Sequence, residues 1–459
     1  MNPSAVSSPV ASVPARATSR IWAGRALLFF GFFAVLAAFP VYTPFDSKLT
    51  LPTTLSLLRE GNIDLDEYTP SFESYRHGLY ERDGHLYNYF PLGPSLAAVP
   101  MVVLVDGFVR LATPVGNLHP TLARPLAHWR HIYDATGSVD LDAWNGPQRL
   151  FASVLTALAG VVMYGLGTAL RLSRRRALLL AAVFVFCTPL LSTASRALWQ
   201  HGPSLLCLTG VLLCLVRARE APRNVAGAGL LLALAYVMRP TNSVSVLLLS
   251  LYVLWTYPRH AWRFFAGALV VAIPWVTVNL VHYGSVLAPY YEPQRLELSA
   301  SRVAEALAGN LVSPARGLLV FTPVLLLCAW GLWLDFRARA FTRLHAVLLA
   351  VVVLHWVAIS TFPHWWAGHS YGPRFFSDMV PFLVFFLVPV ARALQWRGPE
   401  ARRGLTATFA ALAALSLVIH VHGASSRAVY RWNSLPLDVD EHPERLWDWK
   451  DPQFLGRRR

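Results

Sequence analysis

Long apolar segments recur along almost the whole chain, and they limit the possible folds more than any other feature of the sequence. Residues 177–191, 204–216 and 346–359 are examples, and short arginine clusters separate such segments. A helix needs roughly 20 residues, flanks included, to cross the hydrocarbon of a bilayer, and lipid leaves a single segment no other way to satisfy its backbone polar groups. Since 55% of the 459 residues are hydrophobic and only 14% are charged, a soluble globular domain is excluded. The sequence therefore predicts an all-α polytopic membrane protein.

The arginine clusters predict the topology, because basic residues concentrate in cytoplasmic loops. They cover residues 171–176, 217–223, 259–263, 337–343 and 397–403. With a first span over residues 21–42, they predict about 11 transmembrane helices, provided that the proline-interrupted segment 92–111 lies on the outer face as a juxtamembrane or re-entrant helix. The predicted divisions are a disordered cytoplasmic tail over residues 1–20, a transmembrane domain over residues 21–422 with an outer loop over residues 43–91, and an outside tail over residues 423–459.

The net charge of +15 is explained by these loops and does not indicate a nucleic-acid partner. The basic residues punctuate the apolar segments, and no basic surface with interleaved aromatic residues is visible. All the cysteines fall inside apolar segments, so we expect them to be small core residues and neither metal ligands nor disulfide partners. They are Cys187, Cys207, Cys214 and Cys328.

Asp46 follows the first apolar segment by a few residues and opens a polar outer loop that is rich in acids, histidine and tyrosine. A carboxylate held at the membrane surface, beside an outer cavity, is well placed to accept a proton from a hydroxyl group. The leucines of residues 49–58 predict a short amphipathic helix that lies on the bilayer and ends near Gly61. Asp46 could instead be the N-cap of that helix, and the two roles do not exclude each other.

Arginines in the predicted outer loops are a second signal, because the positive-inside rule disfavours them there. They are Arg196, Arg239, Arg316 and Arg374. A guanidinium group binds phosphate oxygens through two parallel hydrogen bonds and stays charged in a low-dielectric setting. These arginines therefore predict a site for a lipid-linked phosphate. The alternative is that they reach lipid headgroups or pair with acids such as Asp378 and Glu292.

The segment GHLYNYFPLGPS, residues 84–95, predicts part of a sugar-phosphate site. His85, Tyr87 and Tyr89 occupy alternate positions, and an extended backbone presents alternate side chains on one side. That side would offer hydrogen-bond donors to a sugar phosphate. The alternative is an ordinary interfacial belt, because aromatic rings with polar tips are common at membrane surfaces.

A later outer segment, HWWAGHSYGPRF, predicts the rest of the sugar or acceptor pocket. Trp366, His369 and Tyr371 stand among glycines in this segment. Glycine lets the backbone approach a ligand closely, and Trp or Tyr faces stack well on sugar rings. His201, which follows Trp199 and Gln200 at the start of another apolar segment, is a further polar candidate.

These features resemble the GT-C superfamily of membrane glycosyltransferases over roughly residues 21–422. The resemblance rests on Asp46 in the first outer loop, the amphipathic outer helices, the motif YFPLGPS at residues 89–95, and the arginines of later outer loops. It is closest to glycosyltransferase family 39 and related bacterial enzymes, which include protein mannosyltransferases and aminoarabinose transferases. It implies a GT-C-like fold in a bacterial-type inner or plasma membrane, with the active site on the extracytoplasmic face.

The resemblance further implies a reaction type, the inverting transfer of a hexosyl or pentosyl group from a polyprenyl-phosphate-linked donor, with Asp46 as the general base. The acceptor is left open. The chain departs from the pattern at two positions, because many relatives carry a second acid where Ser47 stands, and family 39 often has a basic residue where residues 88–90 precede Pro91. We therefore predict no metal site and no cofactor, a divalent metal being disfavoured, and expect His85 or the arginines to bind the phosphate.

Two other function classes fit parts of the sequence. A transporter or flippase for lipid-linked sugars explains the outer arginines, but it predicts charged groups near the middle of the membrane, where His355 is the main polar residue. An oligosaccharide polymerase or ligase shares long outer loops and arginines but does not require an acid directly after the first span. Sugar transfer accounts for Asp46 and is the function that the sequence favours.

Overall fold

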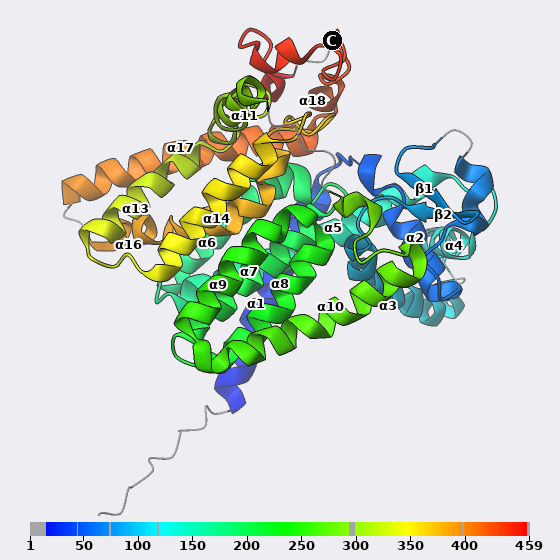
Figure 1. The fold of residues 1–459 in the computed structure, drawn as a ribbon, viewed down its shortest axis with the longest axis horizontal. Coiled ribbons are helices and arrows are strands. Elements are labelled where there is room, and N and C mark those ends of the chain that lie inside the picture. The colour runs from blue at the N-terminus through cyan, green and yellow to red at the C-terminus, as the bar shows by residue number, and fades with distance from the viewer. Residues whose placement is uncertain are drawn as a thin grey trace, which may run out of the picture.

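A computed structural model describes residues 15–43, 45–72, 75–116, 119–292, 299–396 and 399–456. Within these ranges the regular secondary structure is helical apart from one two-stranded hairpin (Figure 1), so the all-α prediction is confirmed. The predicted disordered tail over residues 1–20 falls mostly on residues 1–14, which lie outside the described residues. Residues 15–20, also assigned to that tail, begin helix α1 (Ala15–Ala38) instead.

The centre of the molecule is a bundle of apolar helices. It contains α1 and α5 (Asn145–Ala169), α6 (Arg174–Phe186), α7 (His201–Ala218), α8 (Val225–Met238), α9 (Ser243–Thr256) and α10 (Ala261–Tyr283). Along this bundle α5 packs against α1, α6 and α7, while α8 packs against α7 and α10. A second group lies beside it and contains α11 (Ala300–Val312), α12 (Leu318–Phe321), α13 (Leu327–Arg337), α14 (Arg343–Ser360), α15 (Val380–Phe385), α16 (Val388–Trp396) and α17 (Pro399–Ser425).

Glycines set the closest helix contacts of the bundle. A Cβ atom on Gly229 of α8 would lie 1.9 Å from the carbonyl oxygen of Phe264 in α10, and one on Gly267 would lie 2.2 Å from the carbonyl oxygen of Ala226. Two backbones can approach this closely only where neither helix carries a side chain, which is how small residues promote helix packing in membranes. The pair of glycines therefore determines how α8 and α10 cross.

Among the described residues, seven helices are long and apolar enough to cross a membrane, or eight if the bent pair 374–385 and 388–394 counts as one span. The chain is therefore a membrane protein with several spans. The predicted 11 spans are not confirmed by this count, and Pro222–Met238 and Pro240–Thr256 form shorter apolar helices of 10–17 residues.

Helix α3 (Gly93–Gly116) covers the segment that we predicted to lie on the outer face. By length and composition it could also cross a membrane. It packs mainly against α2 (Thr50–Arg59) and α4 (Pro120–Asp134), and only slightly against α7 and α8 of the bundle. This packing suits a juxtamembrane helix, and Leu104 and Leu111, 73% and 82% exposed, give it an apolar outer side.

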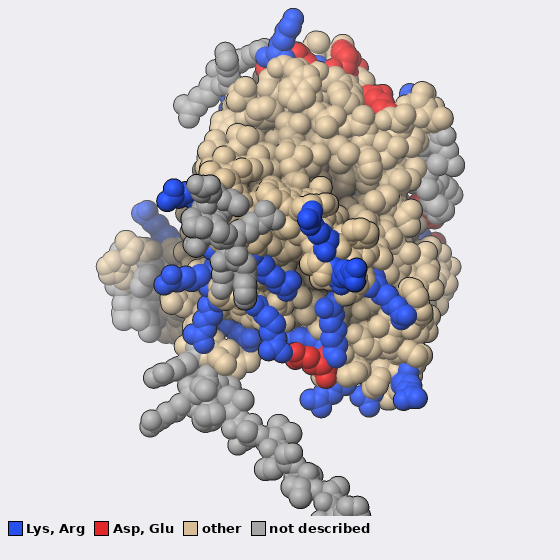
Figure 2. Space-filling view, turned by 90° about the vertical axis from the view of Figure 1, so that its left-hand side faces the viewer, with Lys and Arg blue, Asp and Glu red and all other residues tan. Residues whose placement is uncertain are grey.

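Figure 2 shows lysine and arginine gathered on one face of the molecule, and contacts connect the predicted cytoplasmic clusters at residues 171–176, 217–223 and 337–343. Contacts between the clusters explain this arrangement. Arg171 pairs with Glu220 at 2.6 Å, Arg176 donates to the carbonyl oxygen of Leu394, and Arg219 lies 3.4 Å from the hydroxyl of Thr342. Their convergence supports the alternation of loops on which the topology prediction rested.

The loop after α1 folds into a compact outer unit at the right of Figure 1. It contains α2, α3, α4 and a hairpin of β1 (Leu79–Arg82) and β2 (His85–Asn88). Asp83 and Gly84 both have positive φ and form the tight turn between the strands. Leu49, Leu51 and Leu55 are at most 2% exposed and pack inside this unit, so the prediction that α2 lies with its leucines on the bilayer was wrong.

The C-terminal residues are folded onto the outer end of the second helix group. They form α18 (Ala428–Arg431) and two single turns, Pro443–Trp447 and Gln453–Leu455. Gln453 is completely buried, and its amide donates to the carbonyl oxygens of Ser370 at 2.7 Å and Val429 at 3.1 Å. The segment 423–456 is thus part of the folded core and covers the loop that precedes Arg374.

Candidate functional site

Asp46 lies in a single helical turn, Phe45–Ser47, between the end of α1 and the start of α2. One carboxylate oxygen accepts a hydrogen bond from Nη2 of Arg374, and the other lies 3.6 Å from Nε2 of His77. The N-cap of α2 is Leu49, so the alternative reading of Asp46 as a helix cap was wrong. Its side chain is 20% exposed and can be reached from outside the protein.

Arg374 begins a polar network that runs inward from Asp46. Its Nε donates to Nε2 of His201 at 3.2 Å. On the opposite side of the imidazole, Nδ1 lies 2.9 Å from Nη1 of Arg239, and that Nη1 also donates to Asp378. From the outside inward, the order is Asp46, Arg374, His201, Arg239 and Asp378.

Each inner member of this network stands at the end of a helix. His201 is the first residue of α7, Arg239 directly follows the last residue of α8, and Arg374 and Asp378 belong to a short helical segment, Arg374–Met379, after α14. Proline at position 240 ends α8 at this point and places Arg239 in extended backbone. Because α7 packs against α8 and against residues 374–379, the three ends meet.

The network holds two carboxylates and two guanidinium groups, so its formal charge is zero. Opposite charge at contact distance offsets the cost of removing each ion from water. Burial raises the pKa of Asp46, but the Arg374 guanidinium and His77 outweigh that effect and hold the pKa below its ordinary value. Asp46 is therefore ionised throughout the physiological pH range in the resting protein.

His201 cannot satisfy both arginines at once. A neutral imidazole has one donor and one acceptor nitrogen, while the nitrogens of His201 face one donor each, from Arg239 and Arg374. Only one of the two contacts can be a true hydrogen bond in a given tautomer. One guanidinium N–H therefore has no acceptor on His201. That N–H can donate to an anionic ligand.

A cavity of about 410 Å³ adjoins the inner part of the network. Its polar lining consists of Arg239, Thr241, Ser243, Glu292 and Thr361, and the hydroxyl oxygen of Thr241 is buried without a hydrogen-bond partner among the described residues. The rest of the wall is aromatic or apolar and is formed by Pro240, Tyr290, Tyr291, Ala358, Phe362 and Phe375. A guanidinium beside an apolar cavity suits a ligand that joins an anionic group to a hydrocarbon chain.

Aromatic rings connect the surroundings of Asp46 to this cavity. The ring of His77, beside Asp46, lies 5.8 Å from the ring of Phe90. Phe90 in turn lies 5.6 Å from Tyr290, which lines the cavity. The carboxylate and the cavity are therefore connected by a row of aromatic side chains.

Arg196, predicted to bind phosphate, holds the end of α1 instead. It is completely buried, and its guanidinium donates to the carbonyl oxygens of Leu36 at 2.6 Å and Phe39 at 3.0 Å and to the hydroxyl of Ser195. The last carbonyl groups of a helix have no partner within the helix, and a cation there also interacts favourably with the helix dipole. Arg196 therefore lies outside the polar network.

We expect Arg196→Met to lower the free energy of unfolding by about 1.5–3 kcal/mol, because hydrogen bonds from a charged donor to buried carbonyl groups are lost. Thermal unfolding in detergent measures this loss. Arg110→Met is the control, since the Arg110 side chain is 58% exposed and should shift the midpoint little. Unchanged stability of Arg196→Met would contradict the capping role.

Arg316 likewise has a structural role in place of the predicted phosphate contact. It is 1% exposed, and its guanidinium donates to five protein acceptors. These are the backbone oxygens of Ala315, Trp366 and Gly368 and the side-chain oxygens of Asn433 and Gln453. All its donor groups are occupied, so Arg316 fastens the C-terminal segment to the loop before Arg374.

Of the three residues predicted on the hairpin segment, only Tyr89 contacts the wall of the cavity. His85 is exposed and lies 2.5 Å from Asp66, and this contact raises the pKa of His85. Tyr87 is 6% exposed and packs against Tyr283 of α10. Tyr89 contacts Tyr290 of the cavity wall at 5.4 Å, so of the three it lies nearest to the cavity.

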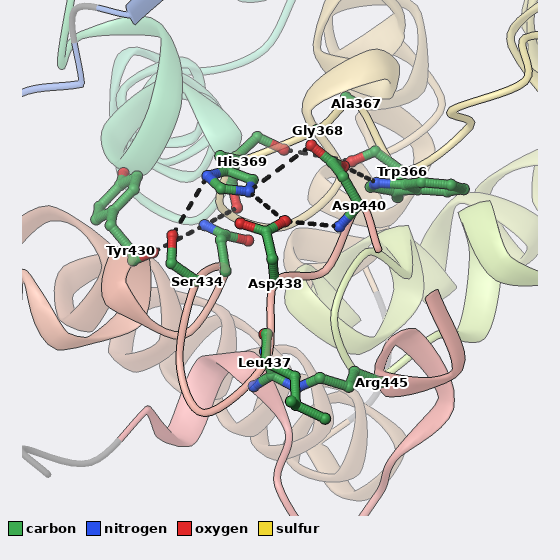
Figure 3. Close-up of polar contacts among 12 residues, drawn as sticks. Trp366, Ala367, Gly368, His369, Tyr430, Ser434, Leu437, Asp438, Asp440 and Arg445 are labelled. Carbon is green, nitrogen blue, oxygen red and sulfur yellow. Dashed lines mark hydrogen bonds and ion pairs between the residues drawn. The ribbon is translucent and has the colours of Figure 1, made fainter. Parts of the chain in front are cut away.

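The aromatic loop residues of the second motif are divided between core and surface. Tyr371 is 1% exposed and donates to the carbonyl oxygen of Ile419, so it serves the core. Trp366 and His369 lie close to Asp440, and Figure 3 shows them facing the C-terminal segment. None of these three side chains lines the cavity beside Arg239.

Sequence reasoning missed His77, which carried no motif and comes close to Asp46 only through the folding of the outer unit. Asp378 was named as an acid that could pair with one of the outer arginines. It does pair with Arg239, at the inner end of the network. An acid beside an apolar segment needs such a partner.

No protein-family model matches the chain, and no curated protein matches it. The proposal of function therefore depends on the residues and their geometry.

Proposed function

We propose that this chain is a membrane glycosyltransferase that moves a sugar from a polyprenyl-phosphate donor to an acceptor hydroxyl, with its site on the extracytoplasmic face. The observation that carries the proposal is the meeting of Asp46, Arg374 and Arg239 through His201, next to an apolar cavity. A base, two phosphate-binding groups and a place for a hydrocarbon chain are the parts that this reaction needs.

The donor would place the first units of its lipid in the cavity and its phosphate between Arg239 and Arg374. Negative charge grows on the phosphate as the bond from the anomeric carbon to the phosphate oxygen breaks, so fixed guanidinium groups stabilise the transition state more than the ground state. Asp46, on the outer side of Arg374, would take the proton of the acceptor hydroxyl.

The resting ion pair between Asp46 and Arg374 makes Asp46 a weak base, because its pKa lies below the ordinary value. A donor phosphate competes with the carboxylate for Arg374. When the guanidinium turns to the phosphate, the pKa of Asp46 rises and the carboxylate becomes a better proton acceptor. Donor binding would thus prepare the base for the reaction.

The proposal is tested by incubating purified protein in detergent with a panel of polyprenyl-phosphate sugars and measuring the free polyprenyl phosphate released. Release with at least one donor supports sugar transfer. Two outcomes contradict it: movement of an intact donor across proteoliposomes without release indicates a transporter, and formation only of lengthened oligosaccharide indicates a polymerase or ligase.

Arg374→Ala is expected to weaken the binding of polyprenyl phosphate about 10- to 100-fold, since a charged hydrogen bond contributes about 1.5–3 kcal/mol. Binding is measured by titration in detergent micelles. Arg427→Ala is the matched control, because Arg427 is exposed and lies over the ring of Tyr42, outside the network. Unchanged affinity in the Arg374 variant would remove Arg374 from the donor site.

A further inference from the structure

His369, Asp438 and Asp440 form a cluster where the loop before Arg374 meets the C-terminal segment (Figure 3). Nε2 of His369 lies 2.9 Å from Oδ1 of Asp438 and 3.7 Å from Oδ2 of Asp440. One imidazole nitrogen thus faces two carboxylate oxygens from a segment about seventy positions away in the sequence. We propose that these three side chains bind a divalent transition metal ion of the Zn²⁺ type.

The spacing of the three donor atoms suits such an ion. Bonds of about 2.0–2.2 Å from the metal to nitrogen or oxygen place neighbouring ligands about 3.0–3.4 Å apart. The two separations at His369, 2.9 Å to Asp438 and 3.7 Å to Asp440, lie just below and just above this range, and all three donor atoms lie within 4.8 Å of one another. A proton on Nε2 could not serve both carboxylates, because it points to one acceptor and the contact with Asp440 is longer than a hydrogen bond. A cation between the three atoms satisfies all of them.

Neighbouring groups hold the ligands in place, as is usual around metal ions. The indole N–H of Trp366 donates to Oδ1 of Asp440 at 2.6 Å, which leaves Oδ2 facing His369. The backbone N–H of Asp440 donates to Asp438 at 2.9 Å. Ser434 lies 3.5 Å from Nδ1 of His369, so a proton on Nδ1 would leave Nε2 unprotonated, as a metal ligand must be.

A second cluster of the same composition fits an ion less well. In the group of Asp64, Asp66 and His85, the histidine nitrogen lies 2.5 Å from Asp66. That distance belongs to a short hydrogen bond with a proton between the atoms, not to two ligands on one ion. The ligand set of one nitrogen and two carboxylates favours Zn²⁺ over Ca²⁺ or Mg²⁺, which prefer oxygen alone.

The ion would connect the loop over residues 366–374 to the C-terminal segment, which Arg316 also joins through Trp366 and Asn433. Its effect is therefore on the stability of this junction, and the proposal does not depend on sugar transfer. Each ligand is between 32% and 41% exposed, so an ion can enter from solvent and the variants should fold.

The test is a binding titration of the full-length protein, stripped of metal with EDTA, using Zn²⁺, Mn²⁺ and Ca²⁺ separately. We expect one Zn²⁺ per chain, a rise in the thermal unfolding midpoint on Zn²⁺ addition, and little response to Ca²⁺. His369→Ala and Asp438→Asn should each weaken Zn²⁺ binding at least tenfold and remove the midpoint shift. His85→Ala, in the second cluster, should leave both unchanged.

Three results would overturn the assignment. They are the absence of Zn²⁺ binding above the level of a buffer blank, binding that survives His369→Ala, and binding that is lost in His85→Ala while His369→Ala retains it. In each case His369 would be a hydrogen-bond partner of Asp438 and nothing more.

Discussion

Asp46→Asn is expected to reduce the release of polyprenyl phosphate about 10²- to 10⁴-fold, the usual effect of removing a general base. Asparagine has nearly the same shape and can still accept a hydrogen bond from Arg374, which also keeps its contacts with His201 and Ala367. The unfolding midpoint should therefore change little, and donor binding should not weaken, because the phosphate no longer competes with a carboxylate for Arg374. The measurement is initial rate at saturating donor, beside a thermal unfolding curve.

Asp83→Asn is the matched control for this variant. Asp83 lies in the same outer unit, is 81% exposed, and occupies a turn position with φ of 53°, which asparagine tolerates. Its activity should equal that of the unmodified protein. If Asp46→Asn retained full turnover with an active donor, Asp46 would have no part in the reaction, although the arginines could still bind phosphate.

The second large effect concerns the buried ion pair of Arg239 and Asp378. Arg239→Ala should lower the free energy of unfolding by about 3–5 kcal/mol, because it leaves the completely buried carboxylate of Asp378 without its cation. Unfolding by SDS titration in mixed micelles measures the loss. Arg171→Ala, which breaks an ion pair with both side chains mostly exposed, should cost no more than about 1 kcal/mol.

A double variant separates the pair from its surroundings. Arg239→Met with Asp378→Leu removes both charges, so we expect a smaller loss of stability than in Arg239→Ala alone. A loss in the double variant equal to the sum of the two single losses would show that the two groups do not interact. The double variant should also lose donor binding, since Arg239 lines the cavity.

Much of the candidate site could be anticipated from residue type and position along the chain. Asp46, Arg239, Arg374 and His201 were all selected because a polar group next to an apolar segment needs a reason to be there, and the structure brings these four together. The same reasoning selected Arg196 and Arg316, which the structure gives to the end of α1 and to the C-terminal segment. Sequence position does not distinguish an arginine that binds a ligand from one that binds backbone carbonyls.

The class of the protein follows from the sequence alone, because the length of apolar segments and the placement of basic residues depend on local composition and on the bilayer. The sequence also marked the predicted outer loops as the place where chemistry could occur. The folded structure was needed to show which polar side chains meet, where the apolar cavity lies, and that the leucines of α2 face protein and not lipid. Those outcomes depend on how helix ends from distant parts of the chain pack together. An ion pair such as Arg239 with Asp378 forms only when that packing brings the two groups within a few ångströms. Local sequence patterns do not encode such distances.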